Sequence, residues 1–161
     1  MKPATSTSGL VPSLCFVRPD LEDGRESALR LLATAAVEQG YARESFVDAV
    51  VEREASFPTG LPLPLPVAIP HADASHILKP GLAALVPATP LRFGEMGSKT
   101  RTVEAGFVLM LLVNEPGEQV ALLGRLIAAL RRPDLEKVLL DGVAEPAELT
   151  RRFEALFSGA G

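Results

Sequence analysis

Gly-Phe-Val-Leu-Met-Leu-Leu-Val, residues 106–113, is the stretch that decides the fold. Every side chain after the glycine is apolar, and Phe and Val favour extended backbone. Successive side chains of a strand point to opposite faces of a sheet, so a strand that is apolar throughout is covered on both faces. We therefore expect a strand over residues 105–113 in the interior of a sheet that has helices on both sides.

The chain on either side of this stretch carries alternating strand and helix patterns. Asp23 with Glu26 three residues later is typical of a helix N-cap, and Gly40 is typical of a helix end. The resulting order, β-α-α-β-β-β-α-α-α, predicts an α/β protein, a three-layer α/β/α sandwich with a mixed four- to five-stranded sheet. The predicted strands cover residues 13–17, 67–69, 81–86 and 105–113, and the predicted helices cover about residues 23–40, 44–55, 118–131, 134–140 and 147–157.

Apolar spacing and prolines refine this prediction. Residues three or four apart share one face of a helix. In the helix at 118–131 this spacing predicts that the residues facing the sheet are Val120, Leu123, Ile127 and Leu130. Leu and Pro alternate over residues 61–66, and three prolines remove three backbone donors, so we expect an extended lead-in there and no central strand.

Length and composition bound the class of protein. A chain of 161 residues with 47% hydrophobic content suits one domain, and its core must be aliphatic because aromatic residues make up only 5%. The net charge of −4 argues against duplex nucleic acid as a partner, since that affinity comes from basic clusters. The single cysteine, Cys15, cannot form an internal disulfide and fits a reducing compartment.

The N-terminal segment predicts neither a secretory signal nor membrane insertion. Residues 1–12 are rich in Ser, Thr and Pro and contain no apolar h-region. No apolar run in the chain reaches the ~20 residues that span a bilayer. We expect residues 1–12 to form a flexible tail, residues 13–158 to form a single domain, and the protein to be cytoplasmic.

Pro-Leu-Pro-Val-Ala-Ile-Pro-His, residues 64–71, delivers one of only two histidines to the end of a predicted strand. From the residues alone, His71 could be a structural histidine, a metal ligand, the base of a hydrolase or a phosphoryl carrier. A metal site would use His71, Asp73 and His76, but nothing supplies a fourth ligand. A hydrolase is disfavoured because no serine lies in a Gly-x-Ser-x-Gly turn.

A phosphoryl carrier needs few parts. It requires an exposed ring nitrogen, a partner that fixes the other ring nitrogen, and positive or N–H groups around the phosphoryl oxygens. Arg53 could be the positive group, because the helix that carries it leads into the loop before His71. Spacing alone favours a different role for Arg53, a solvated ion pair with Glu52 or Glu54.

Two motifs together are specific enough to weigh these roles. Arg-Glu-Ala-Ser-Phe-Pro-Thr-Gly at residues 53–60 and Ala-Ile-Pro-His at residues 68–71, with His76 five residues further on, resemble the enzyme IIA component of the phosphoenolpyruvate-dependent sugar phosphotransferase system. The resemblance is to the fructose/mannitol type, and within it to the galactitol-type IIA proteins most strongly. It covers about residues 14–157, and further matching stretches lie at residues 113–119, 122–123 and 132–134.

The resemblance implies a role for several residues. In this family the histidine after Ile-Pro accepts a phosphoryl group from the phosphohistidine of HPr, which makes His71 the phosphorylated residue. Arg53 corresponds to an arginine that stabilises the phosphoryl charge, and Thr59 and Gly60 belong to the loop beside the site, where they would bind the group. The implied fold is a mixed sheet between helices, and no metal or organic cofactor is implied.

One departure from the family pattern concerns a second active-site histidine. Mannitol-type members place it just before the helix that here begins near Glu118, whereas this chain has Pro-Gly-Glu-Gln at residues 116–119. The second donor to the phosphoryl group must then be His76, Gln119 or backbone N–H groups, or be absent. We expect Glu118 to point away, because its charge would repel a phosphoryl group.

The function implied by the resemblance is that of a phosphotransferase component. His71 would pass its phosphoryl group to a cysteine of an enzyme IIB partner, which phosphorylates a sugar, with galactitol the first choice, as it enters through the membrane component IIC. The alternative is a regulatory nitrogen-type IIA module, whose phosphorylation state controls partner binding. Four residues are candidates for an apolar docking face around the site, namely Leu61, Leu63, Leu65 and Ile77.

Overall fold

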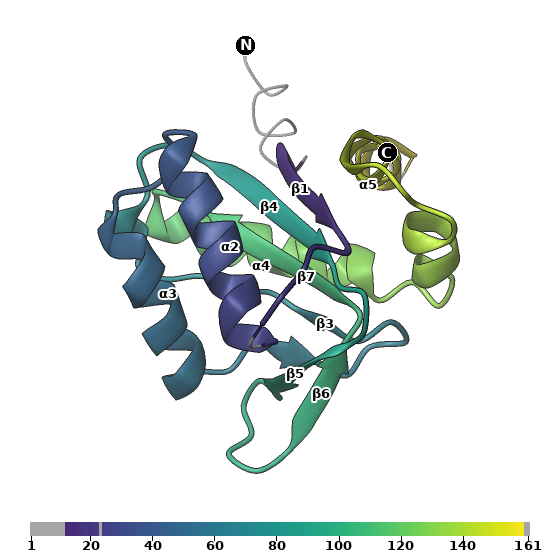
Figure 1. Ribbon diagram of the computed structural model, residues 1–161, viewed down its shortest axis with the longest axis horizontal. Helices are drawn as coiled ribbons and strands as arrows, with labels where there is room; N and C mark the ends of the chain where they lie inside the picture. The colour runs from purple at the N-terminus through teal and green to yellow at the C-terminus, as the bar shows by residue number, and fades with distance from the viewer. Residues whose placement is uncertain (1–11, 23, 160–161) are drawn as a thin grey trace.

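A mixed five-stranded sheet forms the centre of the molecule (Figure 1). Its order is β1-β4-β7-β3-β2, and β7 occupies the middle, as its apolar sequence predicts. β1 is parallel to β4 and β3 is parallel to β7, while β4–β7 and β2–β3 are antiparallel. The strands are β1 (Leu14–Val17), β2 (Gly60–Leu61), β3 (Val67–Ala68), β4 (Gly81–Val86) and β7 (Phe107–Leu112).

Helices cover both faces of this sheet, so the predicted three-layer architecture is confirmed (Figure 1). Each face has its own apolar core: one forms against α2 and α3, and the other forms against α4 and α5. The helices are α2 (Arg25–Glu38), α3 (Ser45–Ser56), α4 (Pro116–Leu130) and α5 (Pro146–Gly159), with a 3₁₀ turn at Ala74–His76 and a π-helical segment at Glu136–Leu140.

The computed structural model describes residues 12–22 and 24–159, and the side chains as far as residue 156. The predicted tail at residues 1–12 therefore lies almost wholly outside the described residues, as does the predicted N-cap Asp23. Helix α2 begins at Arg25 with Gly24 in the capping position, where no side chain supplies a hydrogen bond. In the described part of the chain, no helix is both long and apolar enough to span a membrane.

The predicted element order omitted three short strands. One is β2, and the other two are β5 (Leu91–Gly94) and β6 (Thr102–Ala105), which form a separate two-stranded sheet. The strand predicted over residues 105–113 is interrupted at Gly106, which separates β6 from β7. The N–H of Gly106 donates to the carbonyl oxygen of Pro66 at 2.8 Å. These three strands have two to four residues each and carry too little apolar periodicity to be told from loops by pattern alone.

The predicted buried face of α4 is wrong at its first turn. The residues that the sheet covers are Leu122, Leu126 and Leu130, whereas Leu123 and Ile127 are only partly buried. Val120 is 74% exposed. Two residues of helix turn the chain through about 200°, so a stripe that starts at Leu122 leaves Val120 on the opposite side.

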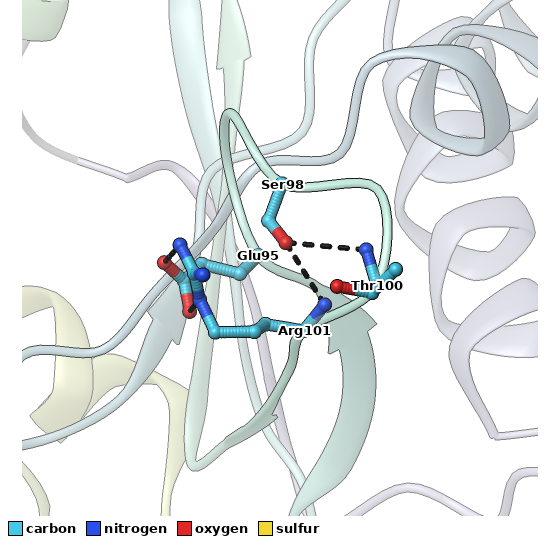
Figure 2. A network of polar contacts seen from close by, with 4 residues as sticks. All are labelled: Glu95, Ser98, Thr100 and Arg101. Atoms are coloured by element: carbon cyan, nitrogen blue, oxygen red, sulfur yellow. Dashed lines mark hydrogen bonds and ion pairs between the residues drawn. The ribbon is translucent and has the colours of Figure 1, made fainter.

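The β5–β6 hairpin has a well-defined tip (Figure 2). Arg101 donates two hydrogen bonds of 3.1 Å to the carboxylate of Glu95, and the Ser98 hydroxyl accepts from the N–H groups of Thr100 and Arg101. The hairpin also joins the main sheet, because Met96 N donates to the carbonyl oxygen of Gly60 at 2.8 Å. It therefore braces the segment that leads from α3 into β2.

Candidate functional site

Segments far apart in the sequence meet beside His71. The loop after β3 carries His71 itself. From the first turn of α4, Gln119 donates through Nε2 to the carbonyl oxygen of Ala72 at 3.2 Å. From β7, the N–H of Leu111 donates to the carbonyl oxygen of Pro70 at 3.0 Å. The backbone is thus anchored immediately before and immediately after His71.

The ring of His71 is held in one tautomer. Its Nδ1 atom lies 2.9 Å from the carbonyl oxygen of Ile69, and a carbonyl oxygen can only accept, so Nδ1 carries the hydrogen and Nε2 holds the lone pair. Burial lowers the pKa of His71, the hydrogen bond to Ile69 acts in the opposite direction, and the charge of Arg53 lowers it further. The net shift is downward, so the ring is neutral at pH 7 and its Nε2 can act as a nucleophile.

Arg53 supplies positive charge to the site. It lies in the last turn of α3 with its Cζ 4.7 Å from the centre of the Phe57 ring. Among the residues that the structure describes, Arg53 forms no salt bridge, so the ion pair with Glu52 or Glu54 that spacing favours is not found. An unpaired guanidinium presents a planar fork of donors that matches a phosphoryl group.

A shallow, open cleft lies between α3 and the loop that follows His71. Arg53 and His76 contribute its basic groups, and Asp73 contributes an acidic one. The hydroxyl of Ser45 lies 2.8 Å from Nδ1 of His76 and ties that ring to the first residue of α3. A second acidic residue, Glu52, also lines the cleft, together with Ala49, Ser56, Phe57 and Ala72.

The predicted site residues fall into two groups. His71 and Gln119 meet at the loop after β3, and Arg53 and His76 line the adjoining cleft. Direct contact of His76 or Gln119 with a bound group stays a prediction. In the described ranges, 12–22 and 24–159, no group of three His, Cys, Asp or Glu side chains could hold a metal ion, so the metal site considered above has no support.

Thr59 and Gly60 lie beneath the surface of the site. The Thr59 hydroxyl donates to Oε1 of Glu54 at 2.8 Å and accepts from the N–H of Ile69 at 3.2 Å. Gly60 packs so tightly against the hairpin that a Cβ there would lie 2.6 Å from the carbonyl oxygen of Gly94. Both residues hold the loop in its place, and a direct contact of either with a phosphoryl group stays a prediction.

Glu54 is the residue of this site that sequence reasoning missed. It is 4% exposed, and its carboxylate accepts hydrogen bonds from both N and Oγ1 of Thr59, at 2.7 and 2.8 Å. The sequence holds a signal for it, because Glu54 continues the spacing of four set by Phe46 and Val50, which are buried on α3. Burial raises the pKa of Glu54 to about 7, although the hydrogen bonds from Thr59 and the charge of Arg25 lower it.

Replacing Glu54 by Gln is expected to change how stability depends on pH. The carboxyl binds its proton more tightly in the folded protein, so its contribution to stability is lost as the pH rises from 4.5 to about 7. The shift corresponds to about 3 kcal/mol. Chemical unfolding should therefore show the wild type losing stability relative to Glu54→Gln across this pH window. Parallel pH profiles for the two proteins would contradict the buried, ionisable state of Glu54.

Known proteins resemble this chain in sequence. The family pattern described as "Phosphoenolpyruvate-dependent sugar phosphotransferase system, EIIA 2" matches residues 13–155. The galactitol-specific EIIA component of the PTS system of Escherichia coli is 29% identical over 117 residues, which are 72% of this chain and 77% of that protein. The fructose-specific EIIA component of Haloferax volcanii is 30% identical over 121 residues, which are 73% of this chain and 75% of that protein.

A solved structure shares the fold. It is the complex of enzyme IIAMTL and phosphorylated enzyme IIBMTL from Escherichia coli, with a TM-score of 0.66 to this chain and 22% sequence identity. The match covers 86% of this chain and 92% of the chain in that complex. At this identity the match is evidence for the architecture alone: helices on both faces of a mixed sheet.

Proposed function

This chain belongs to the EIIA 2 family of the phosphoenolpyruvate-dependent sugar phosphotransferase system, and from that premise we propose that it is a phosphocarrier in which His71 receives a phosphoryl group and passes it on. It is a phosphotransferase component, as its family membership states. The observation that carries the assignment to His71 is the hydrogen bond from its Nδ1 to Ile69, which leaves Nε2 as the free nucleophile. We propose that residues 13–158 form the single working domain.

The proposed transfer uses two matched steps. In the first, the lone pair on Nε2 of His71 attacks the phosphorus of a phosphohistidine on HPr; the new P–N bond forms as the old one breaks, and the donor ring keeps the electron pair. In the second, the thiolate sulfur of an enzyme IIB cysteine attacks the phosphorus; the new P–S bond forms as the P–N bond breaks, and Nε2 of His71 recovers its electron pair. The proton stays on Nδ1 throughout and is donated to the carbonyl oxygen of Ile69, which stabilises the positive charge of the phosphorylated ring.

Arg53 has an electrostatic role in both steps. Phosphoryl transfer spreads negative charge over three equatorial oxygens, so catalysis depends on positioning and on charge stabilisation. Among the described residues Arg53 forms no salt bridge, and its positive charge lowers the pKa of His71. Gln119 keeps the loop after His71 beside the first turn of α4 through its hydrogen bond to the carbonyl oxygen of Ala72.

We propose that the partners are HPr, the enzyme IIB of the same sugar system and, through IIB, the membrane component IIC. The relative in the solved complex binds phosphorylated enzyme IIBMTL, and the sequence relatives are EIIA components for galactitol and for fructose. Galactitol is our first choice of sugar, and we propose a cytoplasmic location. The test is to mix the phosphorylated chain with a purified IIB partner. Loss of the phosphoryl group to a IIB cysteine supports the carrier, whereas retention of it on His71 favours the regulatory alternative.

The four residues that the sequence suggested for a docking face differ in exposure. Leu65 and Ile77 are buried, whereas Leu61 and Leu63 are only partly buried. Among the described residues, the large hydrophobic side chains that are exposed are Phe57, Leu78 and Val120. Phe57 lines the cleft at the end of α3, Leu78 lies two residues after His76, and Val120 follows Gln119 in the first turns of α4.

Replacing Val120 by Asp is expected to weaken partner docking. An exposed apolar residue beside the site gains most when a partner covers it, and a carboxylate there must be desolvated on binding. We expect the second-order rate constant of phosphoryl transfer from HPr to fall about tenfold, or ~1.4 kcal/mol. Ala128→Asp, two turns along the exposed side of α4, is the matched control and should transfer normally. Equal rates for the two variants would remove Val120 from the docking face.

A further inference from the structure

Two polar residues are buried in the described part of the chain, Glu54 and Thr59, and they bond to each other. A buried carboxylate is costly unless hydrogen bonds compensate it, and the pKa of about 7 indicates that the compensation is incomplete. A hydrophobic residue would fill the same space on the buried stripe of α3 without that cost. The proposed reaction does not use Glu54 directly, so the presence of a buried carboxyl group at this position needs a different explanation.

A continuous series of hydrogen bonds leads from Glu54 to the ring of His71. Glu54 accepts from Thr59 N and Oγ1. The Oγ1 of Thr59 accepts from the N–H of Ile69 at 3.2 Å, and the carbonyl oxygen of Thr59 lies 3.4 Å from the same N–H. The carbonyl oxygen of Ile69 accepts from Nδ1 of His71 at 2.9 Å. Glu54 thus fixes the orientation of the residue whose carbonyl selects the tautomer of His71.

The cation of the site and the buried carboxylate come from the same helix, α3. Arg53 and Glu54 are consecutive on α3, so their side chains leave the helix about 100° apart. Arg53 lines the cleft, and Glu54 points into the interior toward Thr59. Helix α3 therefore positions the guanidinium of Arg53 directly, and it positions the loop that carries His71 through Glu54. The relative positions of Arg53 and His71 thus depend on one helix.

From these contacts we propose that Glu54, acting through Thr59 and Ile69, is a positioning residue that keeps the hydrogen of His71 on Nδ1 and the lone pair on Nε2. This proposal rests on the proposed function of His71 as the phosphoryl carrier. The neutral imidazole can hold its hydrogen on either nitrogen, and the partner of one nitrogen decides which form is present. Only the form with a free Nε2 is ready to attack phosphorus.

The test compares Thr59→Val with Thr59→Ser. Valine keeps the shape but removes the hydroxyl that joins Glu54 to Ile69, whereas serine keeps the hydroxyl. The first readout is the ¹⁵N NMR spectrum of the unphosphorylated protein, in which the two ring nitrogens of His71 report where the hydrogen lies. The second is the rate of phosphorylation by HPr. A melting curve of each variant identifies effects that are due to unfolding.

We expect Thr59→Val to show a mixture of the two tautomers and a rate roughly 10- to 100-fold lower, as is typical when a group that orients a histidine ligand is lost. Thr59→Ser should retain the single Nδ1–H tautomer and a rate close to that of the wild type. Asp48→Asn, an exposed carboxylate on the same helix, should leave both readouts unchanged. An Nδ1–H tautomer and a wild-type rate in Thr59→Val would overturn the proposal.

Glu54→Gln keeps the proposal falsifiable if Thr59→Val fails to fold. The amide can accept from Thr59 N, but it presents a donor to the Thr59 hydroxyl, so that hydrogen bond must reverse. The same changes in tautomer and rate are expected, and a wild-type spectrum with a wild-type rate would reject the role of Glu54. A wild-type protein that takes up no phosphoryl group would instead reject the proposed function, whatever the tautomer of His71.

Discussion

His71→Ala protein is expected to take up no phosphoryl group from HPr. The substitution removes the nucleophilic Nε2, and we expect no transfer to His76, because that residue lies outside the Ala-Ile-Pro-His motif and is tied to Ser45 in the neighbouring cleft. Incubation with enzyme I, HPr and phosphoenolpyruvate, followed by intact-mass measurement, should give the unmodified mass for the variant. The wild type should gain a single phosphoryl group that is labile in acid and stable in base.

His76→Ala is the matched control for this result. It removes the other histidine of the chain and the contact with Ser45, but it leaves the anchors of His71 to Ile69 in place. It should still reach one phosphoryl group per chain. The variant His71→Ala loses one partly buried hydrogen bond, worth about 1 kcal/mol, so it should remain folded. Full labelling of folded His71→Ala would show that the nucleophile had been misassigned.

Arg53→Ala is expected to slow phosphoryl transfer by about 10²- to 10³-fold, or ~2.7–4 kcal/mol, which is typical for the loss of one donor aimed at developing charge. The loss of folding stability in Arg53→Ala should be small. Arg53 is exposed, and the contact of its guanidinium with the Phe57 ring, 4.7 Å away, contributes about 0.5–1 kcal/mol at such a site. Single-turnover kinetics with phosphorylated HPr would measure the transfer step directly.

Two further variants separate charge from geometry at Arg53. Arg53→Lys keeps the charge but loses the planar fork that binds two oxygens, so its rate should lie between those of Arg53→Ala and the wild type. Arg92→Ala removes an exposed arginine on the hairpin, which is paired with Glu104, and should transfer at the wild-type rate. A wild-type rate in Arg53→Ala would remove Arg53 from the phosphoryl site.

The sequence predicts the long elements of this fold because their apolar patterns are unambiguous. The predicted strand at 81–86 matches β4, and the apolar run at 106–113 lies at the centre of the sheet. The strands β2, β5 and β6 escape prediction because they are short and are stabilised by contacts with distant residues, such as the bond from Met96 to Gly60. The apolar spacing places Val120 on the wrong side of α4, because a Leu-rich helix admits two apolar stripes.

At the site, sequence patterns identify which residues are special but not what each one touches. Thr59 and Gly60 stand in a motif beside the predicted nucleophile, but the motif does not reveal that Thr59 bonds to Glu54 or that Gly60 packs against Gly94. The partner of Nδ1 of His71 is a backbone carbonyl, which no side-chain pattern can reveal. The sequence suggests Glu54 only as an ion-pair partner of Arg53, because its hydrogen bonds to Thr59 depend on how the chain turns at Pro58.

The most direct test of the central claim is to locate the phosphoryl group. The wild-type protein is phosphorylated by enzyme I, HPr and phosphoenolpyruvate, digested under conditions that preserve phosphohistidine, and analysed by fragmentation mass spectrometry together with ³¹P–¹⁵N NMR of the intact chain. We predict a single phosphoryl group on Nε2 of His71. A phosphoryl group on His76, on Nδ1 of His71 or on any serine, or no phosphoryl group at all, would contradict this account.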